Sequence, residues 1–152
     1  MSHTASPTPA PATAADITQW TGRRQTVVDT ISPVQVRQMA ATLSDGPRLH
    51  DPAGAPLPAG WHWCYFNPIE LQTRLGEDGH PQRGDFLPPV ALPRRMWAGS
   101  RLWWSRAFTV GREVSKASEI LDVRHKQGRS GPTVFVTLQH RYSDEAGPIL
   151  TE

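Results

Sequence analysis

The sequence contains only one cysteine, Cys64, among its 152 residues. A single thiol supports neither an internal disulfide framework nor the cysteine set of a zinc finger. No apolar run approaches the length of a membrane span or a signal-peptide core, and residues 1–16 lack the arginines of a transit peptide. These absences predict a soluble protein of a reducing compartment, the cytoplasm.

The chain also has almost no excess of charge of one sign, because 16 Lys and Arg are balanced by 14 Asp and Glu. A nucleic-acid partner is therefore disfavoured, since attraction of a polyanion needs a clustered surplus of basic residues. The length suits one domain with a sizeable core and is short for two. We expect a disordered Pro/Ala-rich leader over residues 1–16 and one globular domain over residues 17–152.

The first half of the domain carries signals for one strand and one helix. Residues 23–31 are rich in β-branched side chains and predict a strand. Ser32 and Pro33 predict the start of a helix over 33–44, with Gln35 placed as in a capping box and "DGP" supplying a glycine stop. The helix has an apolar stripe at helical spacing, formed by Val36, Met39, Ala40 and Leu43.

The rest of the chain predicts short strands separated by turns, with a further two-turn helix within residues 67–76. The predicted strands are 61–66, 96–104, 113–127 with a bulge, and 133–142. Turns are expected at "GRSGP" and "DEAGP"; a last strand then opens and the sequence ends, which leaves a sheet edge unfinished. A helix-bearing first half packed on an antiparallel sheet defines an α+β fold.

Alternation along two of these strands predicts which side chains are buried. In the predicted strand 96–104, the core-facing residues are Met96, Ala98, Leu102 and Trp104, with Trp97, Gly99, Arg101 and Trp103 on the opposite face. In the predicted strand 133–142, the buried residues are Val134, Val136, Leu138, His140 and Tyr142. A histidine on an apolar face is more often a satisfied core residue than a catalyst, and we expect this of His140.

A stretch rich in tryptophan, arginine and proline, "FLPPVALPRRMWAGSRLWWSR", spans residues 86–106. Three interpretations fit its composition: a stacking platform for nucleic acid, a pocket for a nucleotide-bearing ligand, or an ordinary subunit interface. The residues alone leave all three open.

Four segments carry a resemblance to a known family: "GWHWCYF", "LGEDGHPQRGDFLPPVALPRRMWAGSRL", "SKASEILDV" and "KQGRSGPTVFVTLQHRY". In this order and with these gaps, the chain from about residue 18 onward resembles the N-terminal half of MaoC-like acyl-thioester dehydratases, specifically the group of mesaconyl-CoA hydratases and type 2 hydroxyacyl-thioester dehydratases. That family is built from two hot-dog folds, each a sheet wrapped around a helix. It adds or removes water across a double bond of a coenzyme A thioester.

The resemblance implies that the chain is one half of a double hot dog, with a second hot-dog domain or subunit as partner in a homo- or hetero-oligomer. It also suggests a substrate-binding set, formed by Arg94, Arg95, Trp97 and Gly99. The two arginines would meet coenzyme A phosphates, because guanidinium groups suit phosphate geometry. Trp97 or Trp103 would cover the adenine or line the interface; alternatively, the segment only begins a strand that packs on the partner. No cofactor is implied.

No residue of the chain is assigned a catalytic role. Asp45 and His50 have the spacing of the family's Asp-x-Asn-Pro-x-His loop, but the Asn-Pro pair is absent and the family carries its working motif in the C-terminal hot dog. A helix cap followed by a loop histidine is the favoured interpretation. His62 and Cys64 are too few for a metal site, and Cys64 is expected to be a small buried hydrophobe.

Three functions remain open from the sequence. The leading one is the substrate-framing, non-catalytic half of an acyl-CoA hydratase or dehydratase, inactive as this chain alone. The second is a binding or scaffolding hot-dog subunit without turnover, and the third is a single-stranded nucleic-acid binder, which the balanced charge disfavours. Lys126 and Arg129, near glycines, fit either a phosphate contact or an ordinary hairpin turn.

Overall fold

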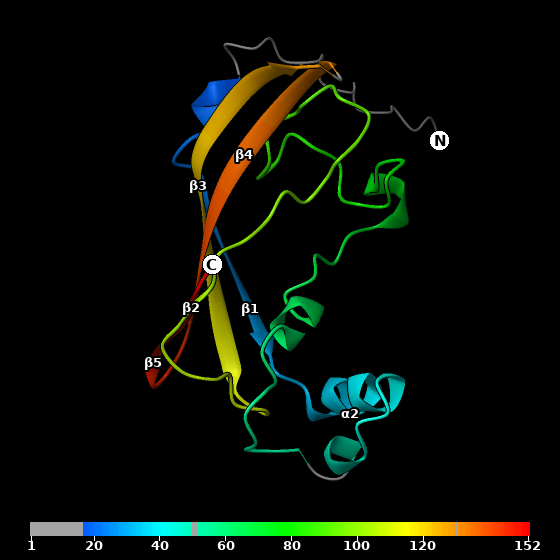
Figure 1. The fold of residues 1–152 in the computed structure, drawn as a ribbon, viewed down its shortest axis with the longest axis vertical. Helices are drawn as coiled ribbons and strands as arrows, with labels where there is room; N and C mark the ends of the chain where they lie inside the picture. Colours follow the sequence, from blue (N-terminus) through cyan, green and yellow to red (C-terminus); the bar gives the residue numbers. More distant parts are fainter. Residues whose placement is uncertain (1–16, 50–51, 130) are drawn as a thin grey trace, which may run out of the picture. The chain divides into compact units, whose positions relative to one another are not determined.

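A computed structural model of the chain describes residues 17–49, 52–129 and 131–152 (Figure 1). These residues divide into two compact units, each of which is described by itself. The first unit comprises the chain up to Arg23, Glu70–Trp97 and Ile120–Thr137. The second unit comprises Arg24–Ile69, Ala98–Glu119 and Leu138–Glu152.

The strands form one antiparallel sheet with the order β1-β3-β4-β5-β2. Their bounds are β1 Arg24–Thr30, β2 Trp103–Trp104, β3 Glu113–Gly128, β4 Gly131–Asp144 and β5 Gly147–Thr151. β3 and β4 form the long pair of strands in Figure 1. With the helix described below, the sheet confirms the predicted α+β class.

β1 and β3 pair without interruption from Arg24 opposite Glu119 to Thr30 opposite Glu113. Because paired residues share a face, Val27 lies on the same side of the sheet as Lys116, and Gln25 on the same side as Ser118. The predicted bulge is absent from this part of β3. The predicted alternation of β4 is confirmed, with Tyr142 buried and its exposed neighbour Arg141 on the other face.

The helix α2, Pro33–Thr42, begins as predicted: the backbone N–H of Gln35 donates to Ser32 Oγ at 3.4 Å. The side chain of Gln35 donates instead to the Cys64 carbonyl, so the reciprocal half of the capping box is missing. At the other end Ser44 adopts the left-handed conformation (φ 58°), and the N–H of Asp45 donates to the Ala40 carbonyl at 2.8 Å. This is a Schellman cap with serine where a glycine is usual, and it stands two residues before Gly46, the predicted glycine stop.

Residues 61–66 do not form the predicted strand. Trp61–Cys64 is a 3-10 helix, η3, that follows Gly60 in the left-handed region (φ 87°). Its hydrogen bonds join residues three apart, as from the Tyr65 N–H to the His62 carbonyl at 3.1 Å. The buried side chains of this stretch are His62, Tyr65 and Phe66, which do not follow the regular alternation that a half-buried strand requires.

Two other predicted elements are shorter than the patterns indicated. Within 67–76 only the 3-10 turn η4, Gln72–Arg74, forms, because the apolar side chains of Ile69 and Leu71 are exposed and have no surface to pack on. Within 96–104 only Trp103 and Trp104 pair, with Thr151 and Leu150 of β5.

The predicted core face of 96–104 is therefore largely wrong. Met96 is 84% exposed, and Leu102 packs against the core as a half-buried side chain. Trp104 is 38% exposed, although its ring meets that of Phe108 at 5.8 Å. Leu43, at the end of the helix stripe, is also exposed. Alternation predicts burial only where a strand has a partner on its flank.

The last strand does not leave the unfinished sheet edge that the sequence predicted. β5 lies between β4 and β2 and so is not an edge strand of the sheet.

The core of the second unit joins the helix to the sheet. Val36 of α2 packs with residues of the strands and of the connecting segments. The cluster contains Ile31, Leu57, Tyr65, Phe66, Phe108, Val110, Val114, Tyr142, Ile149 and Leu150. Burial of this apolar surface is the main source of stability of the unit, at roughly 25 cal/mol per Å².

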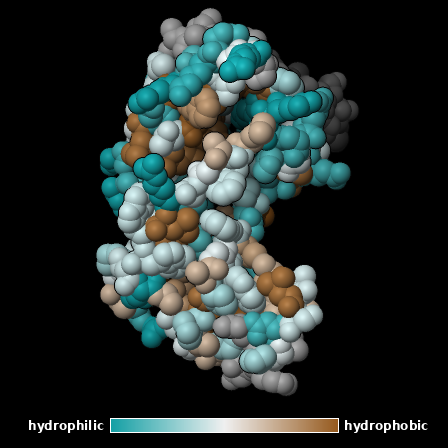
Figure 2. Space-filling view, viewed as in Figure 1, coloured by the Kyte–Doolittle hydropathy of each residue, from teal (hydrophilic) through white to brown (hydrophobic). Residues whose placement is uncertain are grey.

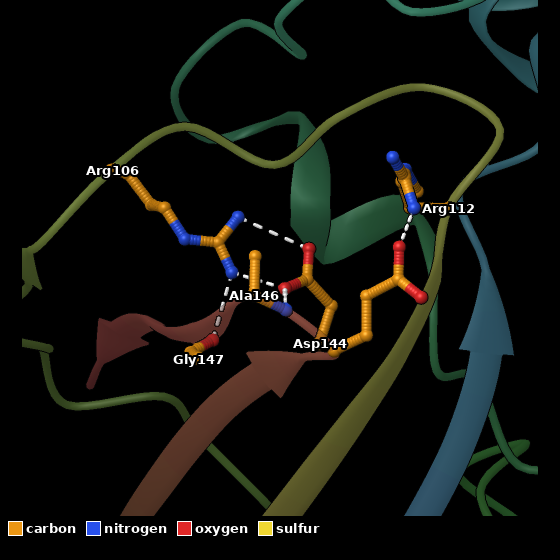
Figure 3. A network of polar contacts seen from close by, with 6 residues as sticks. Arg106, Arg112, Asp144, Ala146 and Gly147 are labelled. Carbon is orange, nitrogen blue, oxygen red and sulfur yellow. Dashed lines mark hydrogen bonds and ion pairs between the residues drawn. The ribbon is translucent and has the colours of Figure 1, made fainter.

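A network of polar contacts holds the turn between β4 and β5 (Figure 3). Arg106 donates two parallel hydrogen bonds to the Asp144 carboxylate and a third, of 2.8 Å, to the Gly147 carbonyl. The Ala146 N–H donates to the same carboxylate at 2.8 Å. Arg112 and Glu145 form a separate, exposed ion pair beside it.

The first unit contains the 3-10 turn η1, Thr18–Trp20, the turn η4, a long irregular segment and the far part of β3 and β4. Trp20 Nε1 donates to the Asp85 carbonyl at 3.1 Å, and the Arg23 guanidinium stacks on the Trp20 ring at 4.5 Å. The buried side chains of this unit are Ile17, Pro88, Ile120 and Val123.

On the face drawn in Figure 2, hydrophobic residues reach the surface in patches interrupted by hydrophilic ones. Large exposed apolar side chains include Ile69, Leu71, Met96, Trp97 and Trp103. Among the residues that the structure describes, no helix is long and apolar enough to cross a membrane.

Candidate functional site

The carboxylate of Glu152 is the centre of a polar cluster in the second unit. Its Oε1 accepts hydrogen bonds from Ser100 Oγ at 2.7 Å and from Trp63 Nε1 at 3.3 Å. Its Oε2 accepts from the Tyr142 hydroxyl at 3.2 Å. Backbone hydrogen bonds of 2.9 Å in both directions between Glu152 and His140 continue the ladder beyond β5 and hold this residue in register.

The side chain of Glu152 is only 11% exposed, so its ionisation depends on these donors. Burial raises the pKa of the carboxyl, but the His62 ring, Ser100 and Trp63 lower it by more, and the result is a pKa of about 2. The pKa of Tyr142 is raised by burial and by the neighbouring Glu152 charge. The cluster therefore holds a fixed carboxylate and a phenol that stays protonated at neutral pH.

His62 lies in an aromatic box next to this carboxylate. Its ring stacks on Phe108 (centroids 5.5 Å apart, planes 10° apart) and meets the edges of Trp104 and Tyr142 at 5.4 and 5.5 Å. The ring is fully buried, and neither nitrogen has a hydrogen-bond partner among the described residues. Nε2 is 3.7 Å from Glu152 Oε2, which is ion-pair distance and longer than a hydrogen bond.

His140 and Ser118 form a second polar pair on the same unit. His140 Nδ1 lies 2.7 Å from Ser118 Oγ, and Ser118 is buried on β3. Burial, followed by the charge of Lys116, lowers the pKa of His140 to about 4. The imidazole is therefore neutral at physiological pH, in agreement with the interpretation of His140 as a satisfied core histidine.

The buried neutral His140 predicts a loss of stability on acidification. Between pH 6.5 and about 4 the unfolded chain binds a proton at His140 that the folded chain does not, so the free energy of unfolding falls as the pH falls through this window. One such proton gives a slope of at most about 1.4 kcal/mol per pH unit. We expect His140→Gln to flatten this part of the stability curve, measured by urea denaturation at a series of pH values.

His125→Gln is the matched control, because it removes an exposed imidazole from the same pair of strands and leaves the surroundings of His140 unchanged. The interpretation is wrong if His140→Gln and the parent chain lose the same stability between pH 6.5 and 4. Glu152 acts in a lower window, since its lowered pKa adds stability that is present above pH 4.5 and lost as the pH falls toward 2.

In the first unit, residues between Gly76 and Arg95 line an open hollow of about 370 Å³. Arg83 donates to the carbonyls of Val90 and Leu92, the latter at 2.6 Å, and so ties the two sides of the segment together. Asp78 lies between two guanidinium groups, 3.4 Å from Arg95 Nε and 3.8 Å from Arg83 Nη2.

The charge of this hollow is partly neutralised from within. The backbone N–H of His80, then the Arg95 and Arg83 guanidinium groups, lower the pKa of Asp78, which is therefore ionised at neutral pH. An anionic ligand would have to share or replace Asp78 as the partner of these arginines.

The substrate-binding residues suggested by the sequence have different surroundings. Arg95 lines the hollow, whereas Arg94 is an exposed residue that does not line it. Trp97 is exposed at the end of the first unit, and Gly99 belongs to the second unit. Of the four, the structure associates only Arg95 with a concave surface, together with Arg83, which the sequence did not single out.

The structure also describes most of the residues that the sequence considered for catalysis, metal binding or phosphate binding. Asp45 is part of the helix cap described above, as the favoured interpretation predicted, whereas His50 lies outside the described residues. Cys64 is a half-buried side chain that packs against the core. No group of three or more His, Cys, Asp or Glu suited to a metal occurs in the described ranges. Lys126 lies 4.9 Å above the Phe135 ring, so the amine at this hairpin already has an aromatic contact.

Sequence reasoning missed Glu152, and it listed Tyr142 only as a core residue. Donors to Glu152 lie 89 and 52 positions away in the chain, so no local motif marks it. The available signal was the phase of β4, which puts His140 and Tyr142 on one face and predicts that a polar partner must meet the phenol there.

Comparison with known proteins agrees with the fold. The family model for hydroxyacyl-thioester dehydratase type 2 matches residues 60–152, which include the Glu152 cluster and the hollow. The chain belongs to this family, whose domain is of the hot-dog type, and the predicted fold class and family are confirmed.

Mesaconyl-C(4)-CoA hydratase of Chloroflexus aurantiacus is a similar curated protein. It is 42% identical to this chain over 128 residues, which are 84% of this chain and 45% of the relative. The chain thus spans about half the length of the curated relative that it matches.

Proposed function

We propose that this chain is the substrate-framing half of an acyl-CoA hydratase or dehydratase, which adds or removes water across a double bond of a coenzyme A thioester. The observation that carries the proposal is the match to the dehydratase family over residues 60–152, supported by the 42% identity to a mesaconyl-C(4)-CoA hydratase. Since the match covers 45% of that relative, a second hot-dog domain or subunit would supply the rest of the site.

Hydration of such a thioester needs an acid and a base that position one water, and a donor that polarises the carbonyl. Among the described residues, the Glu152 carboxylate accepts hydrogen bonds from three donors and the His140 ring is hydrogen-bonded to Ser118, so neither of these two groups is free for proton transfer. This favours a framing role for the chain and a catalytic role for its partner. The single cysteine suits a reducing compartment such as the cytoplasm.

We assign the coenzyme A phosphates to Arg94 and Arg95, with Trp97 and Gly99 in the same substrate-binding set. Arg95 lies at the hollow of the first unit, where it forms an ion pair with Asp78. On binding a phosphate there, its guanidinium would give up Asp78 and donate hydrogen bonds to the phosphate oxygens. A tryptophan ring beside the arginines suits an adenine face. The charge balance of the chain continues to disfavour nucleic acid as the ligand.

The experiment is to follow the absorbance of a conjugated enoyl-CoA with this chain alone, and then with a second hot-dog half from a protein of this family. We expect no turnover by the chain alone and turnover when the second half is added. Binding of a saturated acyl-CoA, followed by tryptophan fluorescence, should weaken about tenfold in Arg94→Gln/Arg95→Gln, which removes charge-assisted hydrogen bonds.

Arg112→Gln, in an exposed ion pair of the other unit, is the control for this loss. Turnover by the unpaired chain would contradict the framing role. Binding without turnover in the paired protein would instead favour a scaffolding or thioester-binding subunit. Tight, salt-dependent binding of an oligonucleotide would contradict both.

A further inference from the structure

The Arg95 guanidinium is partly buried at the hollow of the first unit, and most of its donors are unused. Its side chain is 28% exposed, and its ionic partner is Asp78, whose Oδ2 lies 3.4 Å from Nε. Among the described residues, the two terminal nitrogens of this guanidinium, Nη1 and Nη2, have no hydrogen-bond partner. The planar fork is therefore available to a ligand, and its geometry matches two oxygens of one phosphate group.

Arg83 has a different place in the hollow, because its donors are already used. It donates to the carbonyls of Val90 and Leu92, and its Nη2 lies 3.8 Å from the Asp78 carboxylate. These hydrogen bonds hold the wall of the hollow and keep a second positive charge beside Asp78. Arg83 thus fixes the site, whereas Arg95 supplies the free donors.

The charges that line the hollow are balanced, since Glu77 and Asp78 accompany the two arginines. Glu77 is exposed and has no ion-pair partner among the described residues. Asp78 is the acid that contacts the guanidinium groups, and its other oxygen accepts the His80 N–H at 3.2 Å. An anionic ligand therefore has to replace Asp78 at Arg95.

The kind of anion follows from this exchange. Replacement of a carboxylate is favourable for an anion that carries more charge and more acceptor oxygens. A phosphate monoester carries about −1.5 to −2 charges at pH 7 and has three terminal oxygens. Each phosphate of a diphosphate bridge carries less charge and has fewer terminal oxygens. Coenzyme A contains both kinds, a diphosphate bridge and a monoester on the 3′ oxygen of its ribose.

We propose that the hollow binds the 3′-phosphate of coenzyme A, with Arg95 as its main contact and Asp78 as the counter-ion that the phosphate displaces. The inference rests on the proposed function and deepens it, since it names the phosphate group that the arginine would bind.

Two consequences follow for the ligand. The apolar side chains that line the hollow, among them Val90, Leu92 and three prolines, would contact the adenosine part of the coenzyme. The site would also distinguish a coenzyme A thioester from the same acyl group on a phosphopantetheine arm, because that arm has no 3′-phosphate.

The test compares butyryl-CoA with its 3′-dephospho analogue, which differs in this one group. Binding is measured by calorimetry to the chain paired with a second hot-dog half. We expect the parent protein to prefer butyryl-CoA by about tenfold, as for one charge-assisted contact. Arg95→Gln should bind both thioesters alike, with the affinity for the dephospho analogue unchanged. Arg112→Gln, in the exposed ion pair of the other unit, should keep the preference.

Asp78→Asn tests the exchange from the opposite direction. It removes the competing charge, while the amide oxygen can still accept the His80 N–H. We expect it to raise the affinity for butyryl-CoA roughly fivefold and to leave that for the dephospho analogue unchanged. Glu77→Gln is the matched control, because it removes an exposed charge from the same hollow, and it should change the affinity by less than about twofold.

A second readout needs no variant of Asp78. In the ³¹P NMR spectrum of butyryl-CoA, the signal of the monoester is separate from those of the diphosphate bridge. Binding to the parent protein should shift the monoester signal more than the others, and Arg95→Gln should abolish this difference.

Equal binding of the two thioesters by the parent protein would overturn the inference, and so would a preference that persists in Arg95→Gln. A loss of affinity in Asp78→Asn would show that Asp78 orders the arginines, and would overturn its role as the displaced counter-ion. In these cases butyryl-CoA still binds and the proposed function stands. If the paired parent protein bound neither thioester, the proposed function would fall, and this inference with it.

Discussion

Replacement of Arg106 by alanine is expected to lower the free energy of unfolding by roughly 2–4 kcal/mol. The Asp144 side chain is 4% exposed, and Arg106 supplies both of its guanidinium hydrogen bonds. Without Arg106 the buried carboxylate keeps only the Ala146 N–H, and the Gly147 carbonyl loses its donor (Figure 3). Chemical denaturation of the two proteins measures the difference.

Arg112→Ala is the matched control, because its pair with Glu145 is exposed on both sides and lies beside the same turn. We expect it to cost less than about 1 kcal/mol. Equal losses in the two variants would show that the buried geometry of the Arg106–Asp144 pair adds nothing.

The Arg106–Asp144 pair also makes the free energy of unfolding depend on pH. Hydrogen bonding from Arg106 lowers the pKa of Asp144, so the stabilisation is present above the ordinary carboxyl pKa and is lost as the pH falls through the lowered value. Arg106→Ala should therefore lose less stability than the parent chain on acidification below about pH 4.

Truncation of His62 to alanine should cost about 3 kcal/mol or more, because it leaves a cavity between Phe108, Trp104 and Tyr142. His62→Phe, which fills the same space, should cost less than about 1.5 kcal/mol, since neither ring nitrogen has a hydrogen bond to lose within the described chain. The two variants are compared by urea denaturation at pH 7.

The phenylalanine variant also separates packing from charge. Since the His62 ring helps to lower the pKa of Glu152, that pKa should rise in His62→Phe, as followed by NMR titration of the carboxyl carbon. If His62→Phe were as unstable as His62→Ala, the 3.7 Å contact with Glu152 would matter more than the aromatic packing.

Parts of the fold with local causes were predictable. The N-cap of α2 depends on Ser32, Pro33 and Gln35, which are adjacent in the chain. β4 was predictable because it lies beside β3 in the sheet, and its end, from Arg141 to Asp144, also pairs with β5. The pattern of 61–66 misled, because a run of aromatic residues fits a strand or a 3-10 turn equally well, and only the packing of His62 and Tyr65 distinguishes them.

The candidate site was predictable only in part. Arginine-rich composition directed attention to Arg94 and Arg95, and Arg95 does line a hollow. The residues next to Asp78 and Arg83 in the sequence do not indicate that these two side chains pair at the hollow, because the pairing depends on the path of the turns between them.

The sequence by itself determined the α+β class, the start of the helix, the two long strands and the resemblance to the dehydratase family, because these depend on neighbouring residues and on patterns along one element. Only the tertiary structure decided which polar groups share a site. The contacts of Glu152 join residues up to 89 positions apart, and the burial of His140 follows from the strands on either side of it. Charges and hydrogen bonds act between groups that are close in space, so the partners of each polar side chain are determined only when the sheet and the helix pack together.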